Sequence, residues 1–197
     1  MLERFRRALL LVVLLPGLAP AQYVAVPVLV EGETLGGATV QGVGSPAVSP
    51  SGQIVIEGND THSSLDDFLW VDGIVRISSG DPLAGSPGTL DNVNTFDTTR
   101  PISSGGSVAW AGDLDGVPVT TDQIIARDTT VLLTEGDPSP ITGRVFQDFS
   151  FVSIDDLDRI YFEGDLDGAT SGDEVLMVID GTTVSPHCCK CFHYIHN

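Results

Sequence analysis

The pentapeptide Gly-Asp-Leu-Asp-Gly occurs twice in this chain, at 112–116 and at 164–168, and the two copies start 52 positions apart. The neighbouring sequence repeats with it, in three units marked by two sets of glycines. The spacings are 54 and 52 residues for Gly58, Gly112 and Gly164, and 48 and 56 residues for Gly32, Gly80 and Gly136. Matched landmarks in the same order predict three tandem repeats, over 28–78, 79–134 and 135–185.

Apolar residues within the repeats follow strand-like rather than helical spacing. Short alternating or β-branched runs are separated by Gly, Pro, Asp and Ser, with hairpin turn signals at 71–73, 126–128 and 179–181. The expected strands are Tyr23–Val30, Gln53–Glu57, Phe68–Val71, Ile74–Ile77, Ser107–Ala111, Gln123–Arg127, Thr130–Thr134, Val145–Val152, Arg159–Glu163 and Glu174–Ile179. The pattern predicts an all-β fold.

Units of about four strands at this period are typical of β-propeller blades, which bury their apolar faces against neighbouring blades. The alternative is a continuous β-sandwich whose strands happen to look alike. Closed propellers usually have about four to eight blades. Three repeats over 22–185 therefore predict either an incomplete propeller or an open stack, whose free sheet edges would favour self-association.

The repeat motifs resemble those of a family of secreted bacterial tandem-repeat proteins with β-propeller-like architecture and unknown function. The resemblance is carried by Gly80-Asp81-Pro82, Gly136-Asp137-Pro138, Gly106-Ser107-Val108-Ala109-Trp110 and both GDLDG copies, and it covers about Val28–Ser185. It implies a fold and an extracellular location but no catalytic residue. The first repeat departs from the family pattern, with Gly32-Glu33-Thr34 in place of GDP and Gly58-Asn59-Asp60 in place of GDLDG.

The N-terminus has the features of a secretory signal peptide over 1–21. Three arginines precede an apolar run at Ala8–Leu15, and Ala19-Pro20-Ala21 provides a small-x-small cleavage site. The apolar run is shorter than the roughly 20 residues of a membrane-spanning helix. We therefore expect a secreted or cell-surface protein with no membrane span after cleavage.

The charge balance excludes polyanionic partners. Removal of 1–21 leaves six basic and 26 acidic residues, a formal charge of −20. Nucleic acids and anionic lipids would be repelled by such a surface. The expected partner is an unidentified extracellular protein or glycan.

The acidic turns of the repeats are a candidate calcium site. Asp-x-Asp-Gly offers two carboxylates beside a glycine turn, and a later aspartate precedes the next strand. The candidate ligands are Asp113, Asp115, Asp122, Asp165, Asp167 and Asp173. The alternative is a solvated Asp-Gly turn, which uses both residue types for backbone reasons.

The tail at 186–197 differs in composition from the rest of the chain. It holds Cys188, Cys189 and Cys191 together with His187, His193 and His196. If the tail is genuine, it forms a metal or disulfide site. Its abrupt change of composition favours the other interpretation, a frame-shifted or misassembled end that follows a true repeat.

Catalytic groups are sparse. His62 is the only histidine between 22 and 185, no cysteine lies there, and no nucleophile elbow or phosphate loop occurs. We expect His62 to be a solvated loop residue and Trp70 and Trp110 to be core residues. The sequence favours a non-catalytic structural or binding module. The alternative is a fragment of a secreted carboxylate-dependent hydrolase, with or without calcium.

Overall fold

The computed structural model describes residues 27–61, 67–94, 101–168 and 173–187, and these contain strands and turns but no helix. The all-β prediction is confirmed for this part of the chain, where no helix capable of crossing a membrane occurs. The strands are β1 (Thr34–Leu35), β2 (Ala38–Val48), β3 (Ile54–Asp60), β4 (Asp67–Val71), β5 (Ile74–Ser78), β6 (Thr89–Asn94), β7 (Ala109–Asp115), β8 (Gln123–Arg127), β9 (Thr130–Thr134), β10 (Phe146–Ile154), β11 (Ile160–Leu166), β12 (Glu174–Asp180) and β13 (Thr183–Pro186).

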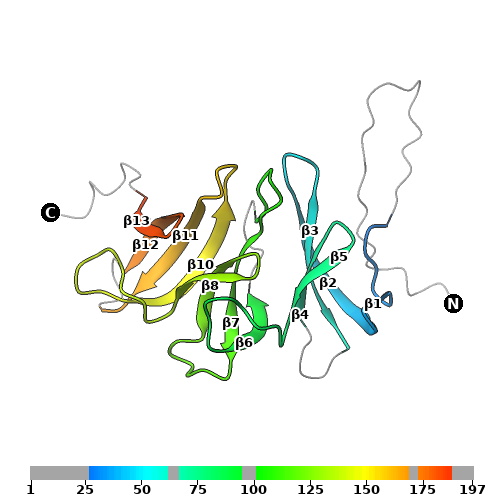
Figure 1. The fold of residues 1–197 in the computed structure, drawn as a ribbon, viewed down its shortest axis with the longest axis horizontal. Helices are drawn as coiled ribbons and strands as arrows, with labels where there is room; N and C mark the ends of the chain where they lie inside the picture. Colours follow the sequence, from blue (N-terminus) through cyan, green and yellow to red (C-terminus); the bar gives the residue numbers. More distant parts are fainter. Residues whose placement is uncertain (1–26, 62–66, 95–100, 169–172, 188–197) are drawn as a thin grey trace.

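The strands form three antiparallel sheets, in each of which the strand order follows the chain. β1–β5 make the first sheet, β6–β9 the second and β10–β13 the third. The sheets stand side by side along the long axis of the molecule (Figure 1). The chain passes from one sheet to the next between residues 78 and 89 and between 134 and 146.

A glycine turn of the same geometry opens each unit. Its glycine is left-handed, with φ of +90° at Gly32, +84° at Gly80 and +86° at Gly136, which glycine adopts without strain. Each glycine N–H donates to a carbonyl oxygen of the following long strand. The pairs are Gly32–Val40, Gly80–Leu90 and Gly136–Phe146, at 2.8, 2.6 and 2.8 Å. In the second and third units, Asp81 and Asp137 add a carboxylate that accepts the N–H three residues earlier, at 2.9 Å.

The other set of repeated glycines lies in mid-strand, and none of the three is left-handed. An aromatic ring covers each glycine on the sheet surface, so a Cβ there would meet a ring carbon. Such a Cβ would lie 2.8 Å from Phe68 Cε2 at Gly58, where Cζ is closer still, 2.9 Å from Trp110 Cζ3 at Gly112, and 2.8 Å from Phe146 Cε1 at Gly164. Close packing, and not turn geometry, therefore requires these glycines.

The GDLDG pentapeptides are strand segments, which corrects their assignment as turns. Gly112–Asp115 lies within β7 and Gly164–Leu166 within β11. Asp167 and the closing glycines lie outside the strands, and both glycines are left-handed, Gly116 at φ +79° and Gly168 at φ +131°. The middle leucine of each motif is buried, so the alternating pattern of the strand continues through the acidic residues.

Neighbouring sheets pack face to face. Between the first and second sheets, Val55, Leu69 and Val71 belong to the same core as Val108, Trp110 and Ile124. Between the second and third sheets, the core includes Ala109, Ala111, Ile125, Leu133, Phe146, Phe162 and Met177. The second sheet is therefore buried on both faces, as its near-continuous apolar strands require.

The tryptophan prediction is confirmed. Trp110 is 0% exposed, and its Nε1–H donates to the Asp128 carbonyl at 2.8 Å. Trp70, 5% exposed, lies on the other face of the first sheet with Ile56 and Phe68.

The strand predictions are accurate where a two-residue hairpin joins the strands. β8 and β9 agree to the residue, and the hairpin turns carry left-handed residues at Asp72, Gly73, Asp128 and Gly181. The prediction of a strand over 23–30 is wrong for its described part, Pro27–Val30. The strands β1, β2, β6 and β13 were not predicted, because glycine, proline and polar residues interrupt their alternation.

Candidate functional site

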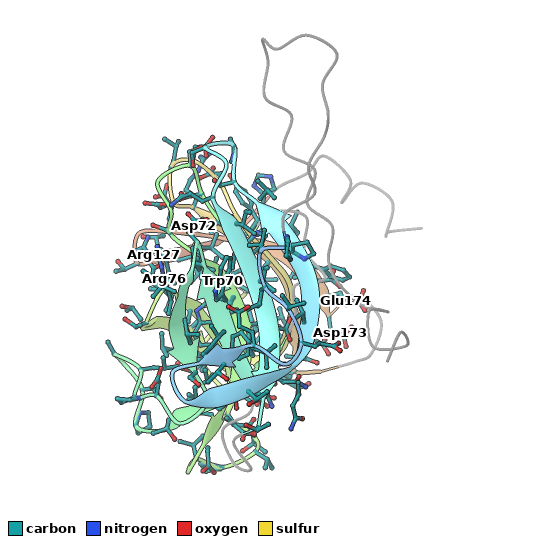
Figure 2. The ribbon with its side chains drawn as sticks, turned by 90° about the vertical axis from the view of Figure 1, so that its right-hand side faces the viewer. Trp70, Asp72, Arg76, Arg127, Asp173 and Glu174 are labelled. Carbon is teal, nitrogen blue, oxygen red and sulfur yellow. The ribbon has the colours of Figure 1, made fainter. Side chains whose placement is uncertain are left out.

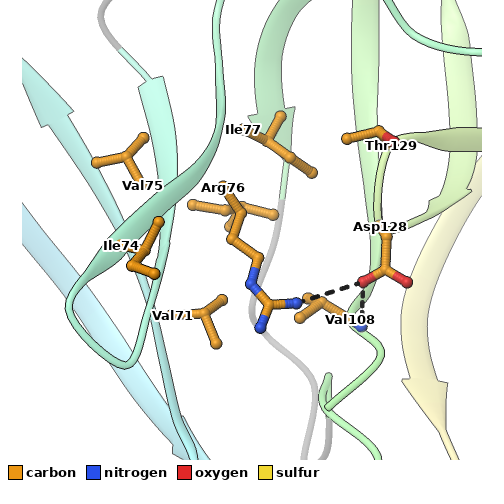
Figure 3. A pocket seen from close by; sticks show the side chains of 9 residues that line it. Val71, Ile74, Val75, Arg76, Ile77, Val108, Asp128 and Thr129 are labelled. Carbon is orange, nitrogen blue, oxygen red and sulfur yellow. Dashed lines mark hydrogen bonds and ion pairs between the residues drawn. The ribbon is translucent and has the colours of Figure 1, made fainter. Parts of the chain in front are cut away.

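A cleft of about 350 Å³ opens between the first and second sheets, and we call it the inter-sheet cleft (Figure 3). One wall is the β4–β5 hairpin, and the other is Val108, just before β7, together with the β8–β9 turn. Its lining residues are Leu69, Val71, Ile74, Val75, Arg76, Ile77, Val108, Asp128 and Thr129. Its volume falls within the range of small-molecule sites, about 300–1,000 Å³.

One cation and one carboxylate face each other across the mouth of the cleft. Arg76 Nη1 lies 3.9 Å from Asp128 Oδ1 and donates to the Gly106 carbonyl at 3.3 Å (Figure 3). The Asp128 carboxylate also accepts the Val108 N–H at 3.0 Å. Both side chains are partly exposed, at 39% and 42%. The apolar walls can take up an apolar group, while this pair can orient polar atoms at the rim.

The hydrogen bond from an arginine to a backbone carbonyl, seen between Arg76 and Gly106, has a counterpart at the interface between the second and third sheets. Gly106 and Asp158 each precede their mid-strand glycine by six residues. Arg127 Nη1 of β8 donates to the Asp158 carbonyl at 3.5 Å. The bond is thus repeated, but the arginine comes from β5 at the first interface and from β8 at the second. Val71 is the residue of the first sheet that corresponds to Arg127, since Val71 pairs with Ile74 as Arg127 pairs with Thr130. Because Val71 is apolar, this wall of the inter-sheet cleft is aliphatic.

A second hollow, of about 440 Å³, lies on the opposite face of β5, and we call it the β1 hollow. It is lined by Leu35, Gly36, Ala38, Asp60, Phe68, Gly73, Ile74, Val75 and Ser78. Phe68 pairs with Ser78 on this face, whereas Leu69 pairs with Ile77 on the face of the inter-sheet cleft. Only Ile74 and Val75 of β5 line both spaces.

The predicted calcium ligands have different hydrogen-bond and ion-pair partners. Asp113 and Asp115 lie two residues apart in β7, and Asp115 Oδ1 accepts the Gly116 N–H at 2.7 Å. Asp167 Oδ1 accepts the Val145 N–H at 2.7 Å and lies 3.5 Å from Arg144 Nε.

Asp165 has acidic neighbours on both adjacent strands, paired with Asp148 of β10 and Glu174 of β12. Its Oδ1 is buried and makes no hydrogen bond to the described residues. Asp173 and Glu174 lie on the side of the molecule away from Asp72 and Arg76 (Figure 2). No group of three or more acidic, histidine or cysteine side chains in the described ranges has an arrangement that could hold a metal ion. Calcium binding stays a prediction.

Asp122 takes part in a carboxylate cluster that the sequence did not reveal. Its partners are Glu135, which follows β9, and Asp148 of β10. Burial raises the pKa of Glu135, and the negative charges of Asp122 and Asp148 raise it further, while a hydrogen bond from the Gln123 backbone acts in the opposite direction. The Gln123 side chain accepts the Phe149 N–H at 2.6 Å and so links the second and third sheets beside this cluster.

Glu135→Gln is expected to stabilise the protein at neutral pH. The folded-state pKa of Glu135 is raised, so the folded protein favours the protonated form, and stability is lost as pH rises through that pKa. A neutral glutamine avoids this loss. We expect a gain below about 1 kcal/mol at pH 7.5 that disappears below pH 4, measured by urea unfolding at both pH values. A variant whose stability difference from the wild type does not vary with pH would contradict this account.

Several residues singled out from the sequence lie outside the described residues: the signal segment 1–21, His62, and the tail cysteines Cys188, Cys189 and Cys191 with His193 and His196. His187 is described. Its N–H donates to the Leu176 carbonyl at 2.8 Å, and its ring meets that of Tyr161 edge-on, with centroids 5.1 Å apart.

The residues at the rim of the inter-sheet cleft were missed by sequence reasoning. Arg76 and Asp128 are 52 residues apart and belong to different repeats, so no local motif joins them. Arginine within an otherwise apolar strand, as in Ile-Val-Arg-Ile at 74–77, was the signal available.

Comparisons with known proteins found no match. No protein-family model fits the chain, and neither the curated proteins nor the solved structures include one that resembles it significantly.

Proposed function

We propose that this chain is an exported, non-catalytic binding module built on a propeller-like stack of three β-repeats, whose ligand occupies the inter-sheet cleft. The observation that carries the proposal is the cleft itself, which combines a wall of aliphatic side chains with a single Arg76–Asp128 pair at its rim. Binding sites typically have this composition: mostly apolar, with a few polar groups that orient the ligand.

Propeller-like stacking is supported by the three meander sheets and by the burial of both faces of the second sheet. The repeated inter-sheet bonds, Arg76 to Gly106 and Arg127 to Asp158, support it further. The proposed export rests on the signal segment, and the resemblance to secreted repeat proteins rests on the repeat motifs of the sequence.

The hydrolase alternative has one specific observation behind it, the raised pKa of Glu135 beside Asp122. Catalytic carboxylates often have such shifts. Among the described residues, however, Asp128 is the one carboxylate that lines the inter-sheet cleft, whereas glycosidic hydrolysis requires a facing pair. Binding is therefore the better-supported function of the cleft.

Fluorescence of the apolar anionic dye ANS tests the proposal. The cleft is expected to bind the dye saturably, with the dye's rings against the aliphatic wall and its sulfonate near Arg76. Val75→Asp places a charge at the wall and is expected to weaken binding at least tenfold. Val119→Asp changes an exposed valine of the β7–β8 loop and should leave binding unchanged. Equal dye binding by wild type and Val75→Asp would contradict a site in this cleft.

A further inference from the structure

The edge of the second sheet shows how an extended segment pairs with a unit of this fold. β9 is its last strand, and Ala84 lies alongside it in a parallel bridge to Thr130. The Ala84 N–H donates to the Thr129 carbonyl, and the Val131 N–H donates to the Ala84 carbonyl, both at 2.9 Å. The edge of β9 is therefore partly satisfied by the protein's own chain.

β5 is the equivalent edge of the first sheet. Both edge strands follow a two-residue hairpin, closed by Val71–Ile74 in the first sheet and Arg127–Thr130 in the second, and both have a register shift at the same place. Gly73 and Val75 therefore correspond to Thr129 and Val131. The Gly73 carbonyl and the Val75 N–H are the groups that would bond an added strand.

In the first repeat, the segment that corresponds to Ala84 does not pair with β5 but forms part of another hairpin. Ala84 lies four residues after Gly80, and the residue four after Gly32 is Gly36. Gly36 forms the turn of the β1–β2 hairpin, where Leu35 pairs with Ala38. Within the described part of the chain, β5 is paired with β4 alone, and its outer edge has no strand partner.

Apolar spaces flank this edge on both sides. The inter-sheet cleft lies on one face of β5 and the β1 hollow on the other, and both are lined by Ile74 and Val75. These two side chains are 65% and 37% exposed. Successive side chains of a strand point to opposite faces, so a strand added to β5 would place alternate side chains in the cleft and in the hollow. Pairing with an edge strand supplies affinity, and pockets for alternate side chains supply specificity.

We propose that β5 binds an extended peptide segment of a partner protein, which runs parallel to β5 and places apolar side chains alternately in the inter-sheet cleft and the β1 hollow. This deepens the proposed binding function and rests on it. The peptide donates an N–H to the Gly73 carbonyl and accepts the Val75 N–H, as Ala84 does with β9. The acidic chain, with a net charge of −18, favours neutral or basic segments over acidic ones.

The probe is a synthetic peptide with the sequence of residues 79–88, which contains the β9-pairing segment, and with Asp81→Asn to remove its only charged side chain. Titrated into the full chain, it is expected to change the fluorescence of Trp70, which pairs with Val75, and to slow hydrogen exchange of the Val75 amide. Val75→Pro removes the outward N–H and should weaken peptide binding at least tenfold. Val119→Pro provides the matched control.

A peptide-side variant keeps the test valid if Val75→Pro fails to fold. Ala84→Pro in the peptide removes the donor to the Gly73 carbonyl and should abolish binding to the wild-type chain. Equal binding of both peptides would overturn the proposal, as would full peptide binding by folded Val75→Pro. Dimerisation of the free chain through β5, seen by sedimentation and abolished by Val75→Pro, would also overturn it, because a second copy would then be the occupant. Failure of the wild type to bind ANS would instead contradict the proposed function, namely that the inter-sheet cleft is a binding site.

Discussion

Trp110→Ala is expected to destabilise the protein by about 4 kcal/mol, the usual cost of removing a buried tryptophan. The side chain is 0% exposed and lies in the core shared by the first and second sheets, where it also covers Gly112. Its Nε1–H bond to the Asp128 carbonyl fixes the β8–β9 turn that forms one wall of the inter-sheet cleft. The variant should therefore lose both stability and ANS binding.

Trp110→Phe separates the two contributions of this side chain. It keeps an aromatic ring over Gly112 but lacks the N–H donor, so we expect a smaller loss, about 1–2 kcal/mol. Urea unfolding monitored by circular dichroism measures both variants. A Trp110→Ala protein within about 1 kcal/mol of the wild type would show that the interface between the first two sheets contributes little to stability.

Gly164→Ala is expected to cost about 3 kcal/mol, since a Cβ at this site would lie 2.8 Å from Phe146 Cε1 and 3.3 Å from Phe162 Cε2. Both rings are buried and pack against Phe149, with centroid separations of 5.4 and 5.8 Å, so neither can move freely. The new methyl group must therefore displace a packed core side chain.

Gly143→Ala is the matched control for this substitution. Gly143 has φ of +79° but no atom within 4 Å of a Cβ, so only backbone strain of about 1 kcal/mol applies. Adding Phe146→Leu to Gly164→Ala should give a total loss smaller than the sum of the two single losses, because the smaller side chain relieves the clash. A Gly164→Ala cost no larger than that of Gly143→Ala would refute the packing explanation for the repeated glycines.

The sequence predicted those features of the fold that depend on neighbouring residues. Hairpins such as Gln123–Arg127 with Thr130–Thr134 combine short apolar runs with a turn that tolerates left-handed backbone, so their limits could be predicted. The repeat was likewise visible from its glycines. The structural reason for these glycines could not be predicted, because the ring that covers each glycine is placed there by tertiary packing, as Phe146 is over Gly164.

The candidate site was not predictable for the same reason. The Arg76–Asp128 pair joins two repeats, and the partner of the arginine is a carbonyl oxygen, which has no signature in the sequence. The difference between β5 and β9 depends on the segment that follows the opening glycine of each repeat. In the first repeat this segment forms the hairpin at Leu35–Ala38, and in the second it pairs with the edge of β9 through Ala84. Nothing local to either segment distinguishes the two outcomes.

Amide hydrogen exchange of the free full-length chain tests most directly the claim that β5 presents an open edge beside the cleft. Val75 and Val131 occupy equivalent positions, but only the Val131 N–H bonds the covering segment, at 2.9 Å to the Ala84 carbonyl. We predict that the Val131 amide exchanges roughly a hundredfold more slowly than the Val75 amide. If the two amides exchange equally slowly, the β5 edge is already covered and is not the binding site.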